Sequence, residues 1–144
     1  MSDLFDDWPV VIEMTGEPTG KGRPRFSRAT GAVYTPEKTA RYEERLAWTA
    51  QGIMRGRPLF ENALEVEVWA HMSVPASKPK RWISDARAGL IFPVKKPDAD
   101  NFAKCLDALN KVVWLDDSQI CDLRVFKRYS EQPRLVVKIR GKTR

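Results

Sequence analysis

The sequence predicts an α+β fold: a single domain over residues 1–144, in which helices pack on one face of a mixed β-sheet. Two observations predict this class. Segments with strand periodicity alternate with segments of helical periodicity, and two further strands follow at the end of the chain. With 42% hydrophobic and 31% charged residues, the chain can bury a core without disulfides or a structural metal.

Strand periodicity is clearest between residues 64 and 72, where five apolar residues alternate with others: Leu64, Val66, Val68, Ala70 and Met72. This pattern predicts a strand with one buried face. A β-branched run at residues 9–15 predicts the first strand, and residues 33–34 predict a short one. The last two strands are expected at residues 119–127 and 134–140. Gln132 and Pro133 separate them, which predicts a hairpin.

The first long helix is expected to begin with Thr35 as N-cap and Pro36 at the first helical position. It would run to about Met54 and end at Gly56. Its apolar face is predicted from four residues near helical spacing: Tyr42, Leu46, Ala47 and Ile53.

The second long helix is expected over residues 100–112, because one apolar stripe runs along it: Phe102, Cys105, Leu106, Leu109 and Val112. A short helix is expected at residues 80–86, inside a connection that contains proline and lysine.

The formal net charge of +6 favours a polyanionic partner, nucleic acid first. The first seven residues are acidic and contain no apolar core of a signal peptide. No apolar run approaches the roughly 20 residues of a membrane span. The two cysteines, Cys105 and Cys121, form no metal-binding or disulfide pattern and are expected to be buried thiols. These observations predict a cytoplasmic protein without a membrane partner.

Basic residues gather in three places that are candidates for contact with DNA phosphates. The first is the Gly- and Pro-rich segment 16–31, which carries Lys21, Arg23, Arg25 and Arg28. The second comprises Lys78, Lys80 and Arg81, and the third is Lys95 with Lys96. Three aromatic residues could stack on DNA bases or pack in the core: Phe26, Trp69 and Trp82. For Trp69, core packing is the favoured role.

Acidic residues surround the second long helix. Asp98 and Asp100 lie at its start, Asp107 lies two turns on, and the pair Asp116–Asp117 follows its end. Asp98 and Asp100 are two residues apart, so in an extended segment both carboxylates point the same way. A helix of about 12 residues spans only about 18 Å. The chain after it can therefore bring Asp117 back towards its start.

Each of these acids also has a structural interpretation. Asp100 is a good N-cap residue. Asp107 is expected to pair with Lys104 or Lys111 on a solvated face. Asp116 and Asp117 are typical turn residues.

A cluster of carboxylates is favourable around a hard divalent cation such as Mg²⁺, because the cation accepts oxygen ligands and offsets their repulsion. Two such ions stabilise the attacking and leaving oxygens of a phosphodiester displacement. Lys104 is then placed to contact the scissile phosphate or to steady the carboxylates.

The order of these residues resembles the signature of the RusA family of Holliday junction resolvases. The resemblance rests on Lys96-Pro97-Asp98-x-Asp100-Asn101-x-x-Lys104, Asp107-Ala108-Leu109-Asn110 and Asp116-Asp117-x-Gln119-Ile120. Looser matches precede it: Gly16-x-Pro18-x-x-Lys21-Gly22-Arg23-Pro24-Arg25 and Val33-Tyr34-Thr35. The resemblance extends from about residue 10 to residue 140.

The resemblance implies a Mg²⁺-dependent homodimer that acts in DNA recombination and repair and resolves four-way junctions by paired nicks. It assigns the essential carboxylates to Asp98, Asp100 and Asp117 and the important lysine to Lys104. Asp107 matches less firmly. Lys111 departs from the pattern, because members of the family often carry glycine there.

Two other functions stay open at this point. In a non-catalytic DNA-binding module, the aspartates would serve only as caps and turns while the basic segments bind DNA. In another Mg²⁺-dependent phosphoryl-transfer enzyme, the substrate would be a nucleotide. The sequence contains no Gly-rich phosphate loop of the P-loop type, which disfavours a nucleotide-hydrolysing motor and predicts no nucleotide cofactor.

Overall fold

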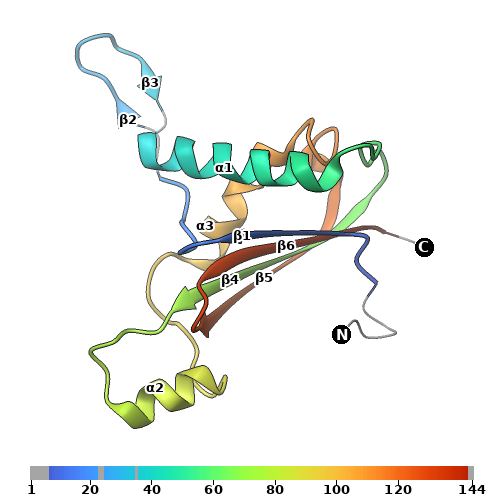
Figure 1. Cartoon of the computed structure of the whole chain (residues 1–144). Helices are drawn as coiled ribbons and strands as arrows, with labels where there is room; N and C mark the ends of the chain where they lie inside the picture. Colours follow the sequence, from blue (N-terminus) through green and yellow to red (C-terminus); the bar gives the residue numbers. More distant parts are fainter. Residues whose placement is uncertain (1–6, 23–24, 35, 143–144) are drawn as a thin grey trace.

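A four-stranded mixed sheet forms the centre of the fold (Figure 1). The computed structural model describes residues 7–22, 25–34 and 36–142. The strands lie in the order β1, β6, β4, β5, and their bounds are Val10–Thr15, Arg134–Gly141, Leu64–Ser73 and Ile120–Ser130. The alternation predicted for β4 is confirmed, since its five apolar residues are all buried.

The predicted hairpin of the last two strands is wrong. β4 lies between them, pairing in parallel with β5 and antiparallel with β6. The burial of β6 explains its place: Leu135, Val136 and Val137 are buried in succession, so both faces of this strand are covered. None of the 11 residues of β5 is buried, and this strand lies at the edge of the sheet.

Helix α1 (Glu37–Met54) covers one face of the sheet, beside α3 (Ala99–Ala103) and the 3₁₀ helix η1 (Lys104–Leu109) (Figure 1). The buried apolar side of α1 recurs every four residues, at Tyr42, Leu46, Ala50 and Met54. Ile53, which was expected on this side, is 38% exposed. The predicted N-cap Thr35 lies outside the described residues, and Pro36 occupies the capping position in the structure.

The helix predicted over residues 100–112 is only partly α-helical. Its second half, η1, is wound as a tighter 3₁₀ helix, and it ends at Leu109. The predicted apolar stripe is nevertheless buried at Phe102, Cys105, Leu106 and Leu109, because residues three apart also share a side of a 3₁₀ helix. Of the two cysteines, Cys105 is buried as expected, whereas Cys121 on edge strand β5 is exposed.

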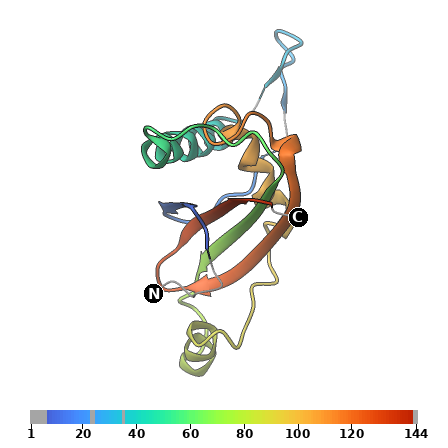
Figure 2. The same cartoon turned by 90° about the vertical axis from the view of Figure 1, so that its right-hand side faces the viewer.

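Two elements extend away from this core. Strands β2 (Arg25–Phe26) and β3 (Val33–Tyr34) form a small hairpin that projects beyond the start of α1 (Figure 2). Helix α2 (Lys80–Arg87) lies beyond one end of the sheet, away from α1. It contacts the sheet through Trp82, whose ring packs edge-on against Tyr129 of β5. In the described part of the chain, no helix has the length and apolar character needed to cross a bilayer.

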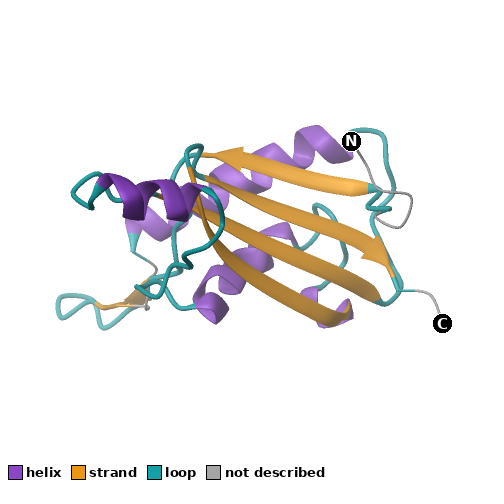
Figure 3. Ribbon diagram, turned by 90° about the horizontal axis from the view of Figure 1, so that it is seen from below, coloured by secondary structure: helices purple, strands orange, loops and turns teal. Residues whose placement is uncertain are grey.

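The other face of the sheet carries a row of aromatic and cationic side chains. Figure 3 views the molecule from this side, with α1 and α3 behind the strands. Trp69 stacks on Phe126 with ring centroids 3.9 Å apart and on His71 at 6.1 Å. The guanidinium of Arg128 lies 5.5 Å from the ring of Trp69. Trp69 therefore lies on the face opposite the buried core.

His71, the single histidine of the chain, makes stability depend on pH. Partial burial lowers the pKa of His71 below the ordinary 6.5, and the positive charges of Arg134, Arg128 and Lys138 lower it further. The negative charge of Glu13 raises this pKa but does not offset the other effects. As the pH falls through 6.5, the unfolded chain binds a proton that the folded protein still excludes. The free energy of unfolding therefore decreases until the folded pKa is reached.

We predict that His71→Gln reduces this loss of stability. Urea unfolding at about pH 7.5 and about pH 5.5, a range chosen because it spans the titration of histidine, measures the effect. The drop in unfolding free energy should be smaller in the variant than in the wild type. Equal drops in the two proteins would mean that another group causes the pH dependence.

Candidate active site

Four aspartates from three segments line one pocket of about 560 Å³. They are Asp98, Asp100, Asp107 and Asp117, and they share the pocket with Lys21 and Lys104. The side chains predicted as catalytic from the sequence, Asp98, Asp100, Asp117 and Lys104, thus come together although the first and third are 19 positions apart. The short α3–η1 segment makes this possible, because both of its ends border the same hollow.

Asp98 and Asp100 reach the pocket from the start of α3. Asp98 is the N-cap residue, with an extended backbone, but its carboxylate makes no capping hydrogen bond. Asp100 lies inside the first turn, so the structure does not use it as the cap. Both side chains are exposed. Their carboxylate oxygens are thus available to a ligand in the pocket.

Lys104 follows Asp100 by one helical turn. Its ammonium Nζ lies 3.9 Å from Oδ2 of Asp100, a loose i,i+4 ion pair on an exposed surface. Such pairs contribute little to stability, about 0.3–0.5 kcal/mol. The Lys104 ammonium can therefore turn from Asp100 towards a phosphate at small cost.

Asp116 and Asp117 have different surroundings despite being neighbours. Asp116 caps the 3₁₀ helix η2 (Asp117–Gln119): its Oδ2 accepts a hydrogen bond from the Ser118 amide at 3.0 Å, and its own amide donates to Oε1 of Gln119 at 2.8 Å. The hydrogen bond from Ser118 lowers the pKa of the Asp116 carboxyl. The turn interpretation is therefore confirmed for Asp116, whereas the half-buried Asp117 lines the pocket.

Two side chains fix the position of η2. The amide of Gln119 donates hydrogen bonds to the carbonyls of Phe60 and Asn62, both at 3.0 Å. Trp114, fully buried, donates its indole N–H to Oδ1 of Asn110 at 2.7 Å and closes the turn that leads back to Asp117. Neither role was predicted from the sequence. The spacing of Asp116 and Gln119, which is that of a capping box, was a usable signal for Gln119.

Asp107 was expected to pair with Lys104 or Lys111, but its partner in the structure is Lys21. Its Oδ2 lies 2.7 Å from Nζ of Lys21, which also lies 3.2 Å from Oε2 of Glu43 in α1. The hydrogen bond to Asp107 raises the pKa of Lys21, and burial raises the pKa of Glu43. The sequence-based expectation failed because the partner comes from 86 positions away, beyond the reach of helical spacing.

The donor set of this pocket suits a hard divalent cation in its chemistry, because every candidate ligand is a carboxylate oxygen. Within residues 7–22, 25–34 and 36–142, no three His, Cys, Asp or Glu side chains are already arranged to hold a metal ion. The ligands are thus not a closed chelate as they stand. The exposure of Asp98 and Asp100 leaves their side chains room to rotate towards the half-buried Asp117.

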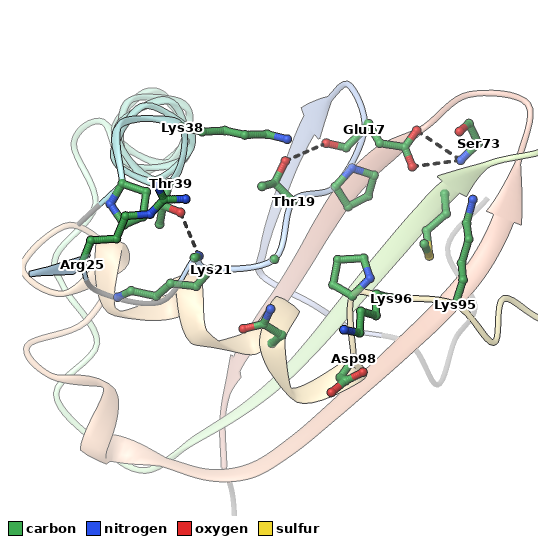
Figure 4. A pocket seen from close by; sticks show the side chains of 17 residues that line it. Glu17, Thr19, Lys21, Arg25, Lys38, Thr39, Ser73, Lys95, Lys96 and Asp98 are labelled. Atoms are coloured by element: carbon green, nitrogen blue, oxygen red, sulfur yellow. Dashed lines mark hydrogen bonds between the residues drawn. The ribbon is translucent and has the colours of Figure 1, made fainter. Parts of the chain in front are cut away.

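A wider basic groove of about 940 Å³ adjoins the pocket (Figure 4). The two hollows share Lys21, Gly22, Asp98 and Asn101. Its cations come from different elements: Arg25 from β2, Lys38 from α1, and Lys95 and Lys96 from the segment before Asp98. Of the other predicted DNA contacts, Arg28 lies on the β2–β3 hairpin and Arg23 lies outside the described residues. Lys38 was not predicted, since nothing in its helical sequence marks it.

A family model described as Endodeoxyribonuclease RusA matches residues 15–140 of the chain. The chain belongs to the RusA family. It is therefore a member of a family of endodeoxyribonucleases, and the resemblance found in the sequence is confirmed. It is also 39% identical over 139 residues to the uncharacterized protein YqaN of Bacillus subtilis (strain 168), a match that covers 91% of this chain and 95% of the relative.

Lys111 is the position at which this RusA family chain departs from the family's frequent glycine. The structure gives Lys111 a φ of 67°, in the left-handed region that glycine adopts without strain. It sits in the turn after η1, where its amide donates to the Trp114 carbonyl at 2.7 Å. The departure therefore leaves the turn geometry intact and places backbone strain in it.

We predict that Lys111→Gly stabilises the protein by about 0.5–1 kcal/mol, because the relief of left-handed strain exceeds the added entropy of the unfolded chain. Urea unfolding measures the change. Gly89→Ala is the matched control: Gly89 has a φ of 81° and open space around it, so alanine there adds strain alone and should destabilise. A destabilised Lys111→Gly variant would contradict the interpretation.

Proposed function

We propose that this RusA family protein is a Mg²⁺-dependent, structure-selective endodeoxyribonuclease that resolves four-way DNA junctions by paired symmetric nicks, in DNA recombination and repair. One observation supports the proposal above the others. Asp98, Asp100 and Asp117 line one pocket, while the neighbouring Asp116 is used up by capping. Asp98 makes no capping hydrogen bond, and Asp100 and Asp117 lie inside helical turns rather than at the cap positions, so capping does not account for these three acids.

Asp98, Asp100 and Asp117 would hold the divalent cation. When bound, the ion supplies charge neutralisation at the phosphate and lowers the pKa of a water molecule. Hydrolysis then forms a bond from the water oxygen to phosphorus and breaks the bond from phosphorus to O3′. The products are a 5′-phosphate and a 3′-hydroxyl.

Lys104 is the residue we assign to the developing negative charge. Its side chain is 59% exposed and only loosely paired with Asp100, so its ammonium can follow a non-bridging phosphate oxygen as charge accumulates there. A flexible lysine acts here as a point charge and needs no fixed geometry.

The groove beside the pocket is our candidate path for the DNA backbone. Arg25, Lys38, Lys95 and Lys96 line it together, and phosphate neutralisation by such cations provides most of the affinity for DNA. Arg28, on the projecting hairpin, is proposed as a contact farther along the duplex. The sequence also predicted Arg23, which lies outside the described residues, and Lys21, whose ammonium is held by Asp107 and Glu43 in the structure.

We further propose that the protein acts as a homodimer. A four-way junction has two-fold symmetry, so resolving it requires one cut in each of two symmetric strands. A C₂ dimer places two identical pockets in that relation.

A nicking assay tests the proposed function. The purified protein is incubated with a four-way junction, a replication fork and a linear duplex, each with and without Mg²⁺. We expect symmetric nicks in the junction only with Mg²⁺, and little cutting of the duplex. Binding of the junction without nicking under any divalent metal would instead favour the non-catalytic DNA-binding module.

A matched pair of variants tests the site. We predict that Asp117→Asn lowers the cleavage rate on the order of 100-fold or more, because it removes a charged ligand from the pocket. Asp116→Asn should retain the rate within about twofold, since asparagine caps a helix as well as aspartate does. Both variants should bind the junction without metal as the wild type does. Equal losses in the two variants would show that the turn matters rather than the pocket.

A further inference from the structure

Lys21 is held by acidic residues that come from distant parts of the chain. Its ammonium contacts Asp107 of η1 at 2.7 Å and Glu43 of α1 at 3.2 Å. The side chains of Lys21 and Glu43 are 24% and 19% exposed, so this ion cluster is partly withdrawn from water. Two nearby carboxylates offset the positive charge of this lysine, so it attracts a further anion, such as a DNA phosphate, only weakly.

The loop that carries Lys21 is fixed to the site by its backbone as well. The Lys21 amide donates to the Asn101 carbonyl at 3.4 Å, and the Gly22 amide donates to Oγ1 of the buried Thr39 at 2.8 Å. Gly20 leaves no room for a side chain: a Cβ there would lie 2.5 Å from Nδ2 of Asn101. The loop therefore forms a wall of the pocket.

At its other end the loop is tied to the sheet. The Ser73 amide at the end of β4 donates a bifurcated hydrogen bond to both carboxylate oxygens of Glu17, at 3.2 and 3.3 Å (Figure 4). Segment 17–22 is thus attached to β4, to α1 and to the α3–η1 segment. Among the hydrogen bonds and ion pairs of the described residues, Lys21 is the one through which segment 17–22 contacts Asp107.

Asp107 lines the same pocket as the three proposed metal ligands and is 45% exposed. Without a counter-charge it would be a fourth carboxylate free to join them. With Lys21 in place, it is held by a cation of the protein itself. The number of carboxylates available to a metal then depends on Lys21.

We propose that Lys21 is a positioning residue: its ammonium holds Asp107 and the loop 17–22 against the pocket, and reserves Asp98, Asp100 and Asp117 for the metal. This inference rests on the proposed function for its catalytic consequence only. It assigns Lys21 a role different from the DNA contact that its sequence position predicts. The two roles have different measurable consequences.

The first measurement separates positioning from DNA contact. Junction affinity is measured without divalent metal over a range of salt concentrations, for Lys21→Met and for Lys96→Met as the comparison. Loss of one phosphate contact reduces the slope of log affinity against log salt by about 0.9. We expect that reduction for Lys96→Met. For Lys21→Met we expect an unchanged slope and an affinity within about twofold of the wild type.

The second measurement follows the metal directly, by calorimetric titration with Mn²⁺ in the absence of DNA. Lys21→Met removes one positive charge and frees Asp107, so Mn²⁺ affinity should rise on the order of fivefold. The double variant Lys21→Met/Asp107→Asn should return towards the wild-type affinity. Lys80→Met, which removes a distant lysine of α2, should leave it unchanged.

Cleavage at saturating junction completes the test. Lys21→Met should lower kcat roughly tenfold or more with little change in KM, since the defect lies in the pocket and binding is intact. Lys21→Arg, which can keep both ion pairs, should retain most of the rate. Asp107→Asn should not slow Lys21→Met further, because both remove the same contact.

Two outcomes would overturn the proposal. One is a salt slope reduced by about 0.9 in Lys21→Met together with a normal kcat, which would make Lys21 a DNA contact. The other is an Mn²⁺ affinity identical in the wild type and Lys21→Met. If the wild type cuts no substrate at all, the proposed function fails, and the Mn²⁺ titration still decides the role of Lys21. Should Lys21→Met not fold, Lys21→Gln carries the same measurements, since it also removes the charge that holds Asp107 while keeping a polar side chain at this position.

Discussion

The turn from Asn110 to Trp114 determines where the last aspartate of the pocket lies. The buried indole of Trp114 donates to Asn110 while the Trp114 carbonyl accepts from Lys111, so this turn is closed by a side-chain and a backbone hydrogen bond. Phe60 extends the same anchor: its amide donates to Val113, and its carbonyl accepts from Gln119. Gln119 belongs to η2, the 3₁₀ helix that begins with Asp117. Hydrogen bonds through Phe60 therefore connect the turn around the buried Trp114 to the backbone of Asp117.

This arrangement separates rigid from adaptable groups. The backbone that carries the carboxylates is fixed by the buried apolar side of residues 102–109, by the Asp116 cap and by the hydrogen bonds of loop 17–22. The side chains of Asp98 and Asp100, in contrast, are exposed, and Asp98 makes no capping hydrogen bond. A cation can then draw flexible side chains together over a preformed backbone. Under the proposed function, binding would order these side chains alone, because the backbone that carries them is already in place. As the proposed path of the DNA backbone, the basic groove next to the pocket would attract phosphate where the carboxylates alone would repel it.

Local patterns predicted local structure well. The alternation in β4 and the apolar stripe of residues 102–109 led to the correct buried faces, because burial of one side depends on spacing along the chain. The order of the strands was predicted wrongly, since adjacency in sequence suggested a hairpin while the two-sided burial of β6 required a central position. Likewise, the motif selected Asp98, Asp100 and Asp117, which line one pocket, and their role as metal ligands stays a prediction. The partner of Asp107 depends on a tertiary contact, which no local spacing encodes.

In the proposed site, carboxylates from both ends of the α3–η1 segment bind one divalent cation together. Titration with paramagnetic Mn²⁺, followed by amide NMR signals, tests it most directly because broadening reports nearness to the ion. If both segments bind the ion, the signals of residues 98–101 and 117–119 broaden at the same Mn²⁺ concentration, while those of α2 stay sharp. Broadening of only one of the two segments, or of neither, would contradict it.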